Sequence, residues 1–430
     1  MNTLESMRRG ELGALLIVLA VLILLPVGRT SELPILIGGL IGIGLLLRHR
    51  IEPLAGPGLR LTLVLFACYW IPVFLSAFSA VMAQKSWMTA LEILRFLPFA
   101  LFVAWALRKG EFWQPFLGAV AAVSALWIID AWVQIVGGYS LAGAPELNRI
   151  SGIFGAGNLK LGPVLAVLSP FLLLAAREKA GRWGLLLAFI FVLVPILMSG
   201  SRAAWLSFAL VTLAFGWRET RSFRRFFPLL LGALLGVALC AGLILRDSER
   251  FDSRIERSLL VFQGTEQAID EASAGRLRIW SAAIDMIKAH PLSGVGARGF
   301  RYDYAEHASA GDDFVDAATG TGASHAHQIV LEVLTETGLI GLIFWIAGGV
   351  YAIRTWRRAT TDQQVRAFAP GLALAVMCFP LNTHFAFYSA WWGLFFWWLL
   401  AIFCAALTAG AKQAEGNPAD QSGGSDKHRP

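Results

Sequence analysis

Hydrophobic residues form long continuous runs along almost the whole chain, and short polar stretches separate these runs. Runs of about 18 or more apolar residues are typical of helices that span a membrane. A transmembrane β-barrel is disfavoured, because its strands would alternate apolar and polar positions. The runs predict about twelve membrane spans, at residues 12–28, 33–47, 59–81, 87–107, 112–136, 159–176, 183–199, 202–217, 226–245, 338–355, 367–381 and 391–409.

One interruption, residues 246–337, is too long for an ordinary connector. Its sequence predicts a helix from Arg276 to His290, which Pro291 ends before a glycine-rich turn. A second amphipathic stretch, 328–335, is expected to lie at the membrane surface before the tenth span begins. The first helix carries an apolar stripe made of Ile279, Trp280, Ala283, Ile284 and Ile287.

The whole pattern predicts an all-α integral membrane protein. We expect transmembrane helices one to nine in residues 1–245 and a large helical loop domain at 246–337. Helices ten to twelve follow in 338–409. The polar remainder, 410–430, is expected to be a disordered tail because it has too few apolar residues to form a core.

Composition changes this picture little. The chain is 57% hydrophobic and only 15% charged, whereas ordinary soluble domains carry about 25% charged residues. The net charge of +7 could suggest nucleic acid, but the basic residues concentrate in alternate loops, as the positive-inside rule predicts. We therefore expect no nucleic-acid partner, both termini in the cytoplasm of a bacterial inner membrane, and the long loop in the periplasm. The four cysteines lie in apolar segments and are expected to be core residues.

The outer side of the predicted topology collects basic residues that could bind an anion. Arg202 opens the eighth span, where free N–H groups at a helix N-terminus favour negative charge. Arg276 opens the first loop helix, and His325 and His327 end the loop. Guanidinium groups bind phosphate oxygens through two parallel hydrogen bonds, and a histidine can take a proton near neutral pH. Three further cations are expected on the same side: Lys85, Arg149 and Lys160.

Simpler interpretations remain open from these residues. An arginine at a membrane interface is usually an anchor whose charged end reaches water. The His325 and His327 pair could hold a metal, but no further cysteine or carboxylate pattern completes such a site. The acidic pair Asp312-Asp313 is expected to be solvated loop. A flippase or transporter would need polar residues along a path through many helices, and the predicted spans hold few, so an enzyme is favoured.

The end of the loop reads His327-Gln-Ile-Val-Leu-Glu-Val-Leu-Thr-Glu-Thr-Gly-Leu-Ile-Gly341. This segment resembles the signature of the O-antigen ligase and polymerase superfamily. Further segments resemble the same family in the same order and cover roughly residues 150–390. They are Ile150-Ser-Gly-Ile-Phe-Gly-Ala-Gly-Asn158, Ser199-Gly-Ser-Arg202, Gly275-Arg-Leu-Arg-Ile-Trp280 with Pro291-Leu-Ser-Gly-Val-Gly296, and Pro380-Leu-Asn-Thr-His384.

The resemblance implies a twelve-helix membrane glycosyltransferase with a large periplasmic loop. As an O-antigen ligase, it would move O-antigen glycan from undecaprenyl diphosphate to the lipid A-core, with inversion and without a cofactor or metal. By the same resemblance His327 is the base, and Arg276 and Arg202 grip the diphosphate. The chain departs from the family in having Gln328 where asparagine is frequent, which weakens any role for that position. Substrate contacts are expected from Lys85, Arg149, Asn158, Lys160 and His325.

Two alternatives within the superfamily stay open. An O-antigen polymerase would use similar groups on a different acceptor. A protein O-oligosaccharyltransferase would place the glycan on a hydroxyl of a protein. A lipid-linked glycan flippase remains the alternative from another class.

Overall fold

The computed structural model describes residues 9–48, 57–144, 149–222 and 273–408, with seven positions between them at 224, 226–228, 231, 265 and 270. Within these residues the chain is all-helical, and β structure is confined to two isolated bridges. The predicted ninth span, apart from its first positions, lies outside the described residues, as do loop residues 246–264 and the tail 410–430.

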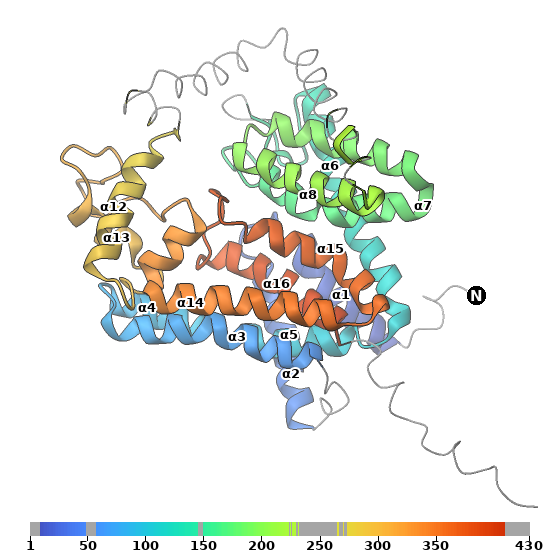
Figure 1. Cartoon of the computed structure of the whole chain (residues 1–430), viewed down its shortest axis with the longest axis horizontal. Coiled ribbons are helices and arrows are strands. Elements are labelled where there is room, and N and C mark those ends of the chain that lie inside the picture. Colours follow the sequence, from blue (N-terminus) through green and yellow to red (C-terminus); the bar gives the residue numbers. More distant parts are fainter. Residues whose placement is uncertain are drawn as a thin grey trace, which may run out of the picture.

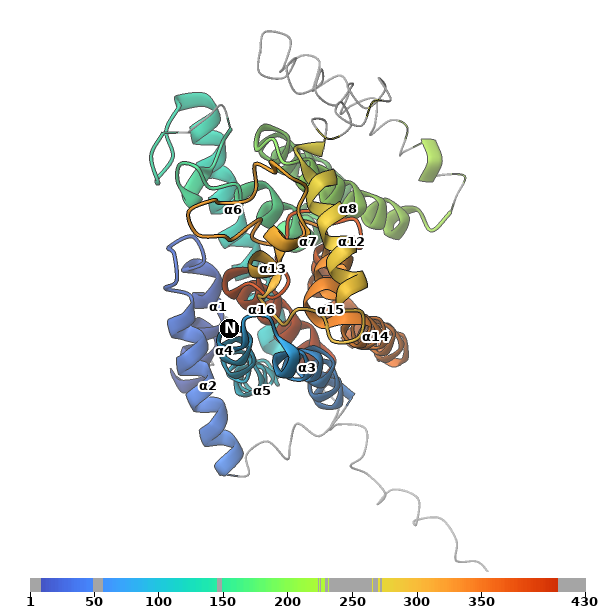
Figure 2. The same cartoon turned by 90° about the vertical axis from the view of Figure 1, so that its left-hand side faces the viewer.

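Thirteen α-helices are described in this part of the chain. They are α1 (Arg9–Ile23), α2 (Glu32–Leu47), α3 (Pro57–Ser76), α4 (Ala83–Ile93), α5 (Phe96–Ala106), α6 (Trp113–Gly137), α7 (Leu161–Met198), α8 (Arg202–Thr220), α12 (Arg276–Ala289), α13 (Phe300–His307), α14 (Ile329–Arg358), α15 (Thr361–Met377) and α16 (Ala390–Ala406). In Figure 1, α3 and α14 run side by side, and α7 and α8 form a layer beside α15. Figure 2 shows α16 in the middle of the bundle, where nearly all of its side chains are buried.

The length and apolar composition of the helices indicate a multi-pass helical membrane protein. Five helical segments are long and apolar enough to cross a membrane: Gly58–Ser79, Ala83–Ala106, Gly110–Gly137, Leu161–Met198 and Ile329–Arg358. Three shorter apolar helical segments are Gly10–Ile23, Glu32–Leu47 and Ala390–Ala406. The total of twelve spans stays a prediction.

Three predicted spans are joined or divided by local backbone features. The spans expected at 159–176 and 183–199 are joined as α7, which bends at Ala180 and Gly181, where the glycine has a φ of +64°. The span expected at 87–107 is divided into α4 and α5 by a break before Phe96. The hydrophobic pattern predicts which stretches form apolar helices, but it does not show where the backbone bends within such a stretch.

A second break, in α14 at Gly338, accommodates the glycine-rich turn. Gly338 has a φ of +65°, so the hydrogen bonds that would cross it in a continuous helix are missing. The turn replaces them: Val295 N and Gly296 N donate to the carbonyls of residues 335 and 336, at 2.8 and 3.1 Å. In return, Leu339 N and Ile340 N donate to the carbonyls of residues 291 and 292, at 2.9 and 3.2 Å. The turn therefore satisfies four backbone groups of α14 around the break.

The close approach at this break requires glycine on both sides. A Cβ added to Gly294 would lie 2.5 Å from the Thr335 carbonyl oxygen, and one added to Gly338 would lie 2.2 Å from the Leu292 carbonyl oxygen. On its other side the turn contacts the start of α4, where Ser86 donates to the Ala297 carbonyl at 3.0 Å. The loop is thus fixed to two separate membrane helices at its base.

The loop has its own small core around α12 and α13, which lie beyond one end of α3 and α14 (Figure 1). The predicted helix from Arg276 is confirmed, and it ends at Ala289. The predicted stripe is wrong at Ile284, which is 45% exposed. Its buried face consists of Ile279, Ala282, Ala283 and Met286.

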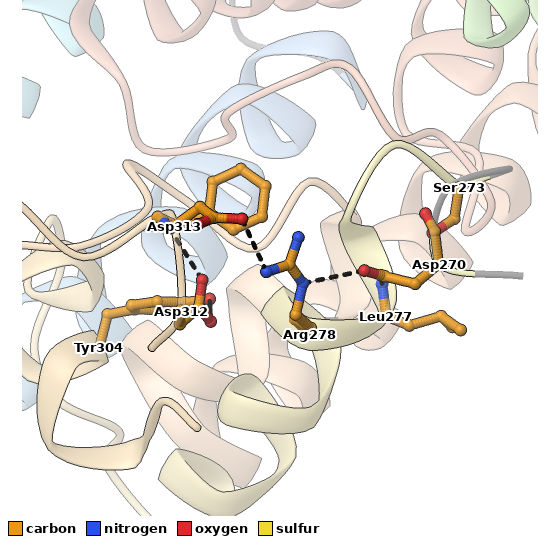
Figure 3. A network of polar contacts seen from close by, with 8 residues as sticks. Asp270, Ser273, Leu277, Arg278, Tyr304, Asp312 and Asp313 are labelled. Carbon is orange, nitrogen blue, oxygen red and sulfur yellow. Dashed lines mark hydrogen bonds and ion pairs between the residues drawn. The ribbon is translucent and has the colours of Figure 1, made fainter. Parts of the chain in front are cut away.

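Polar contacts join α12 and α13 to other parts of this loop (Figure 3). Arg278 binds Asp270 at 2.9 Å and Asp313 at 3.2 Å. The expectation of a solvated acidic pair is wrong for Asp312, which is buried. Its carboxylate accepts hydrogen bonds from the Tyr304 hydroxyl at 2.8 Å and from the backbone of residue 314 at 2.9 Å.

Candidate functional site

His327 lies directly before α14 and has an unusual backbone conformation. Its φ is +50°, a left-handed value that costs energy for any residue with a Cβ. Such strain persists only where the surroundings enforce it, and it is frequent at functional sites. The segment is held by Gln328, whose side-chain oxygen caps α14 and whose Nε2 donates to the Pro380 carbonyl at 2.8 Å.

The ring of His327 donates a hydrogen bond to the backbone carbonyl of Thr383. This bond fixes the tautomer, because the nitrogen that donates must carry the proton and the other nitrogen is then free to accept one. Burial and the positive charge of Arg276 lower the pKa of His327 to about 4, against the opposing effect of the Thr383 bond. The imidazole is therefore neutral near pH 7 and can act as a base.

The ring of His325 packs against that of His327, with 3.8 Å between the ring centroids and 44° between the ring planes. Its Nδ1 lies 2.9 Å from the Ser324 hydroxyl. Its Nε2 is buried and has no hydrogen-bond partner among the described residues. Burial, followed by the positive surroundings, lowers the pKa of His325 to about 2. This neutral ring thus presents a nitrogen that a substrate hydroxyl could satisfy.

A third histidine, His384, joins this group from the loop between α15 and α16. Its backbone N–H donates to the side-chain oxygen of Asn382 at 3.0 Å, and its ring packs edge-on to Trp392 at 5.4 Å. Burial lowers the pKa of His384 to about 3, and the charges of His327, Arg276 and Lys160 act in the same direction. Sequence reasoning placed this residue in a family motif but gave it no role in the site.

Two arginines lie within electrostatic range of one another, and one of them lies within range of His327. Arg276 begins α12, and Arg202 begins α8, whose N-cap is Ser201. Burial and the charge of Arg202 lower the pKa of Arg276, so the two guanidinium groups interact although 74 positions of sequence separate them. Arginine stays charged in proteins, and two adjacent cations favour an anion between them.

Lys160 completes the set at the start of α7. Its ammonium lies 4.3 Å from the centroid of the Trp391 ring, and burial lowers its pKa. Together these side chains are the basic cluster of the site: Lys160, Arg202, Arg276, His325, His327 and His384.

Three residues predicted to bind substrate are less clearly connected to the basic cluster. Asn158 caps the turn before α7, because its side-chain oxygen accepts from the Lys160 N–H at 3.2 Å. Lys85 lies on α4 beside the glycine-rich turn, and Arg149 precedes the short 3-10 helix η4 (Gly152–Phe154). Neither Lys85 nor Arg149 is among the charges that shift the pKa values of the three histidines or of Arg276, so their contact with substrate stays a prediction.

The polar groups of the cluster suit a multiply charged anion. In the part of the chain that the structure describes, no group of three histidine, cysteine, aspartate or glutamate side chains is arranged to hold a metal ion. The arrangement instead offers permanent cations beside neutral imidazoles. Such a site can bind a diphosphate and accept a proton from a neighbouring hydroxyl.

The fold indicates a multi-pass helical membrane protein, and the cations of its basic cluster have the charge to bind an anion. The family model described as O-antigen ligase matches residues 186–346. This range contains Arg202, Arg276 and His327 and supports membership of the O-antigen ligase and polymerase superfamily, whose members are glycosyltransferase-like membrane enzymes. The comparison with curated proteins gives no match.

Proposed function

We propose that this chain is an O-antigen ligase, which transfers O-antigen glycan from undecaprenyl diphosphate to the lipid A-core at the periplasmic face of the inner membrane. The observation that carries this proposal is the arrangement around His327. One ring nitrogen is committed to the Thr383 carbonyl, and the ring lies beside Arg276, which in turn interacts with Arg202. This combination supplies a base and a diphosphate clamp in one place.

These groups account for the bond formed, the bond broken and the proton transferred in the reaction. The free nitrogen of His327 takes the proton from an acceptor hydroxyl, whose oxygen forms a bond to the anomeric carbon of the donor. The bond from that carbon to the diphosphate oxygen breaks, and undecaprenyl diphosphate leaves with the electron pair. Attack from the face opposite the diphosphate inverts the anomeric configuration. Arg202 and Arg276 stabilise the charge that grows on the leaving group.

The remaining residues are assigned by position. Lys160 and His325 lie within the basic cluster and would contact the glycan or the diphosphate. Lys85, Arg149 and Asn158 would contribute at the edge of the site, where a glycan or lipid headgroup extends. The polyprenyl tail would lie among the apolar helices. Both termini would be cytoplasmic, and the site periplasmic, as the positive-inside rule requires.

The central test replaces His327 by alanine in the purified protein. We expect transfer to fall about 100-fold to 10,000-fold, the range for loss of a general base, while donor binding persists. His325→Ala should cost less. His290→Ala, a loop histidine outside the basic cluster, is the matched control and should retain activity. Wild-type turnover in His327→Ala would refute the proposal.

A second measurement addresses metal dependence. We expect transfer to continue in excess chelator, because Arg202 and Arg276 supply the charge that a divalent ion would otherwise provide. A loss of activity that Mg²⁺ or Mn²⁺ restores would contradict this expectation.

The acceptor distinguishes the ligase from its relatives in the superfamily. Deleting the gene should remove glycan-capped lipopolysaccharide while lipid-linked polymer accumulates. Loss of a polymerase would instead leave single repeat units on the lipid. Loss of a protein O-oligosaccharyltransferase would leave lipopolysaccharide intact and remove glycan from proteins. A flippase would show no transfer in detergent with purified donor and acceptor.

A further inference from the structure

The first two and a half turns of α14 carry a polar face that no role above accounts for. Gln328, Glu332 and Glu336 follow one another at intervals of four residues, so they lie on one side of the helix. Glu332 and Glu336 are each only 1% exposed. Burying carboxylates is costly unless other groups satisfy them, which raises the question of what they hold.

Each side chain of this face holds a different piece of backbone. Gln328 Nε2 donates to the Pro380 carbonyl at 2.8 Å. Glu332 Oε1 accepts from Tyr388 N–H at 3.3 Å, and the backbone of residue 387 also donates to this carboxylate. These two contacts fix both ends of the segment 380–388, which contains Thr383 and His384.

Glu336 holds the other loop. Its Oε2 accepts from Arg298 N–H at 2.7 Å, and Phe300 N–H donates to the same carboxylate. Arg298 has a φ of +65°, a strained conformation that the carboxylate stabilises by binding its N–H. Residues 291–299 form the base from which α12 extends, so fixing them fixes the helix that carries Arg276 at its far end.

A direct contact links α12 to the segment that carries His325 and His327. Trp280, one turn beyond Arg276 on α12, donates from Nε1 to the Ala326 carbonyl at 3.1 Å. Ala326 lies between His325 and His327 in the sequence. Displacing either loop would therefore change the separation between the base, the arginine and the Thr383 carbonyl that sets the tautomer.

We propose that Glu336 and Glu332 are positioning residues for glycosyl transfer, which hold the loops of Arg276 and Thr383 in register with His327. This inference rests on the proposed function and adds residues that touch no substrate. The two carboxylates differ in one testable respect. Glu336 receives two N–H donors from residues that lie on either side of Gly299, whereas Glu332 Oε2 is buried with no partner in the described structure.

Substitution by glutamine should have different effects at Glu332 and at Glu336. In Glu332→Gln the amide oxygen can accept the existing N–H donors while the NH₂ replaces the unpartnered oxygen. Glu336→Gln loses one acceptor oxygen beside two backbone donors, so a single amide oxygen must accept both hydrogen bonds. The control is Asp312→Asn, because Asp312 is also buried and also accepts two hydrogen bonds, but it holds only the loop's own core.

The experiment measures kcat, KM for the lipid-linked donor and the unfolding temperature of each variant in detergent. We expect Glu336→Gln and Glu332→Ala to lower kcat about tenfold to 100-fold, the loss typical of misplaced catalytic groups, with donor KM nearly unchanged. Glu332→Gln should retain wild-type kcat. Asp312→Asn should lower the unfolding temperature but leave kcat of the folded protein unchanged.

A second readout does not depend on activity. Hydrogen–deuterium exchange should increase in the peptide containing Arg298 and Phe300 in Glu336→Gln, and in the peptide 383–388 in Glu332→Ala. Wild-type kcat in Glu336→Gln, or an equal loss of kcat in Asp312→Asn, would overturn the positioning role. Absence of transfer in the wild type would instead refute the proposed function, while the exchange result would still test the loop contacts.

Discussion

Arg276 and Arg278 lie two residues apart on α12 and meet opposite surroundings. Arg278 binds Asp270 and Asp313, its side chain is 37% exposed, and these carboxylates raise its pKa (Figure 3). Arg276 is half-buried and lies close enough to Arg202 for that charge to lower its pKa. No carboxylate of the described residues forms an ion pair with Arg276.

This difference separates a structural arginine from one prepared for a ligand. Arg278 has its counter-charges within the loop, and an exposed pair of this kind contributes about 0–1 kcal/mol to stability. Arg276 keeps a charge in half-buried surroundings beside a second cation. That arrangement is unfavourable in the free protein and becomes favourable when an anion enters. We infer that binding of the donor diphosphate would offset the repulsion between Arg276 and Arg202.

Replacing each arginine by alanine should give the largest contrast. Arg276→Ala is expected to lower kcat/KM for transfer on the order of 100-fold to 1000-fold, the range for loss of one charge-stabilising donor. Arg276→Lys keeps the charge but loses the planar fork, so it should also impair transfer. Arg278→Ala should leave kcat/KM within about twofold and change stability by less than about 1 kcal/mol.

Steady-state transfer and thermal unfolding of the same preparations test this contrast. Equal losses in both alanine variants would mean that α12 is merely sensitive to substitution. Full activity in Arg276→Lys would indicate an interfacial anchor instead of a diphosphate clamp.

Hydrophobic pattern and family motifs predicted the helical membrane fold and the residues at the centre of this comparison. Arg202, Arg276 and His327 were each identifiable from a helix start or a loop end. The structure adds their mutual proximity, which the resemblance implied and which local sequence alone cannot give. Their catalytic roles stay predictions.

The other features of the fold and the site could not be predicted, because they depend on contacts between segments that are distant in the sequence. The Thr383 carbonyl sets the tautomer of His327, yet a backbone carbonyl has no sequence signal. The insertion of the glycine-rich turn into the break at Gly338 needs both partners in three dimensions. Asp312 was misjudged because the Tyr304 hydroxyl that satisfies it lies eight positions earlier. His384 was identifiable only as a polar residue in a motif near the last helix.

Inorganic pyrophosphate offers a smaller test that needs no lipid substrate. Binding to the folded protein raises stability by about 2.7 kcal/mol at a ligand concentration 100 times Kd. We expect pyrophosphate to raise the unfolding temperature of the wild type and of Arg278→Ala, but not that of Arg276→Ala or Arg202→Ala. Sulfate at the same ionic strength is the control for general salt effects. An equal rise in all four proteins would contradict a specific diphosphate site.

The smallest expected effect concerns the pH dependence of transfer. His327 must be unprotonated to act as a base, and its pKa in the free protein is about 4 because of burial and then the charge of Arg276. Activity should therefore be lost only as pH falls well below 6.5, the ordinary value for histidine. The acid limb of kcat/KM reports groups of the free enzyme, so it should lie near the pKa of His327.

Replacement of Arg276 and replacement of Arg278 should affect the acid limb of kcat/KM differently. Arg276→Gln removes a charge that disfavours the imidazolium, so the acid limb should move upward, toward 6.5. Burial is the larger cause and remains, which limits the expected shift to about one pH unit or less. Arg278→Gln should leave the limb in place, because Arg278 is not among the groups that shift the pKa of His327. The stability of the protein should also decrease as pH falls. Because the pKa values of His325, His327 and His384 are depressed in the folded protein, the unfolded chain binds more protons. The unfolding temperature should therefore fall as pH drops from about 6.5 toward 4. Normalised pH–rate profiles of the residual activity of both glutamine variants test the shift of the acid limb. A limb that moves equally in both glutamine variants, or in neither, would show that Arg276 does not set the protonation of the base.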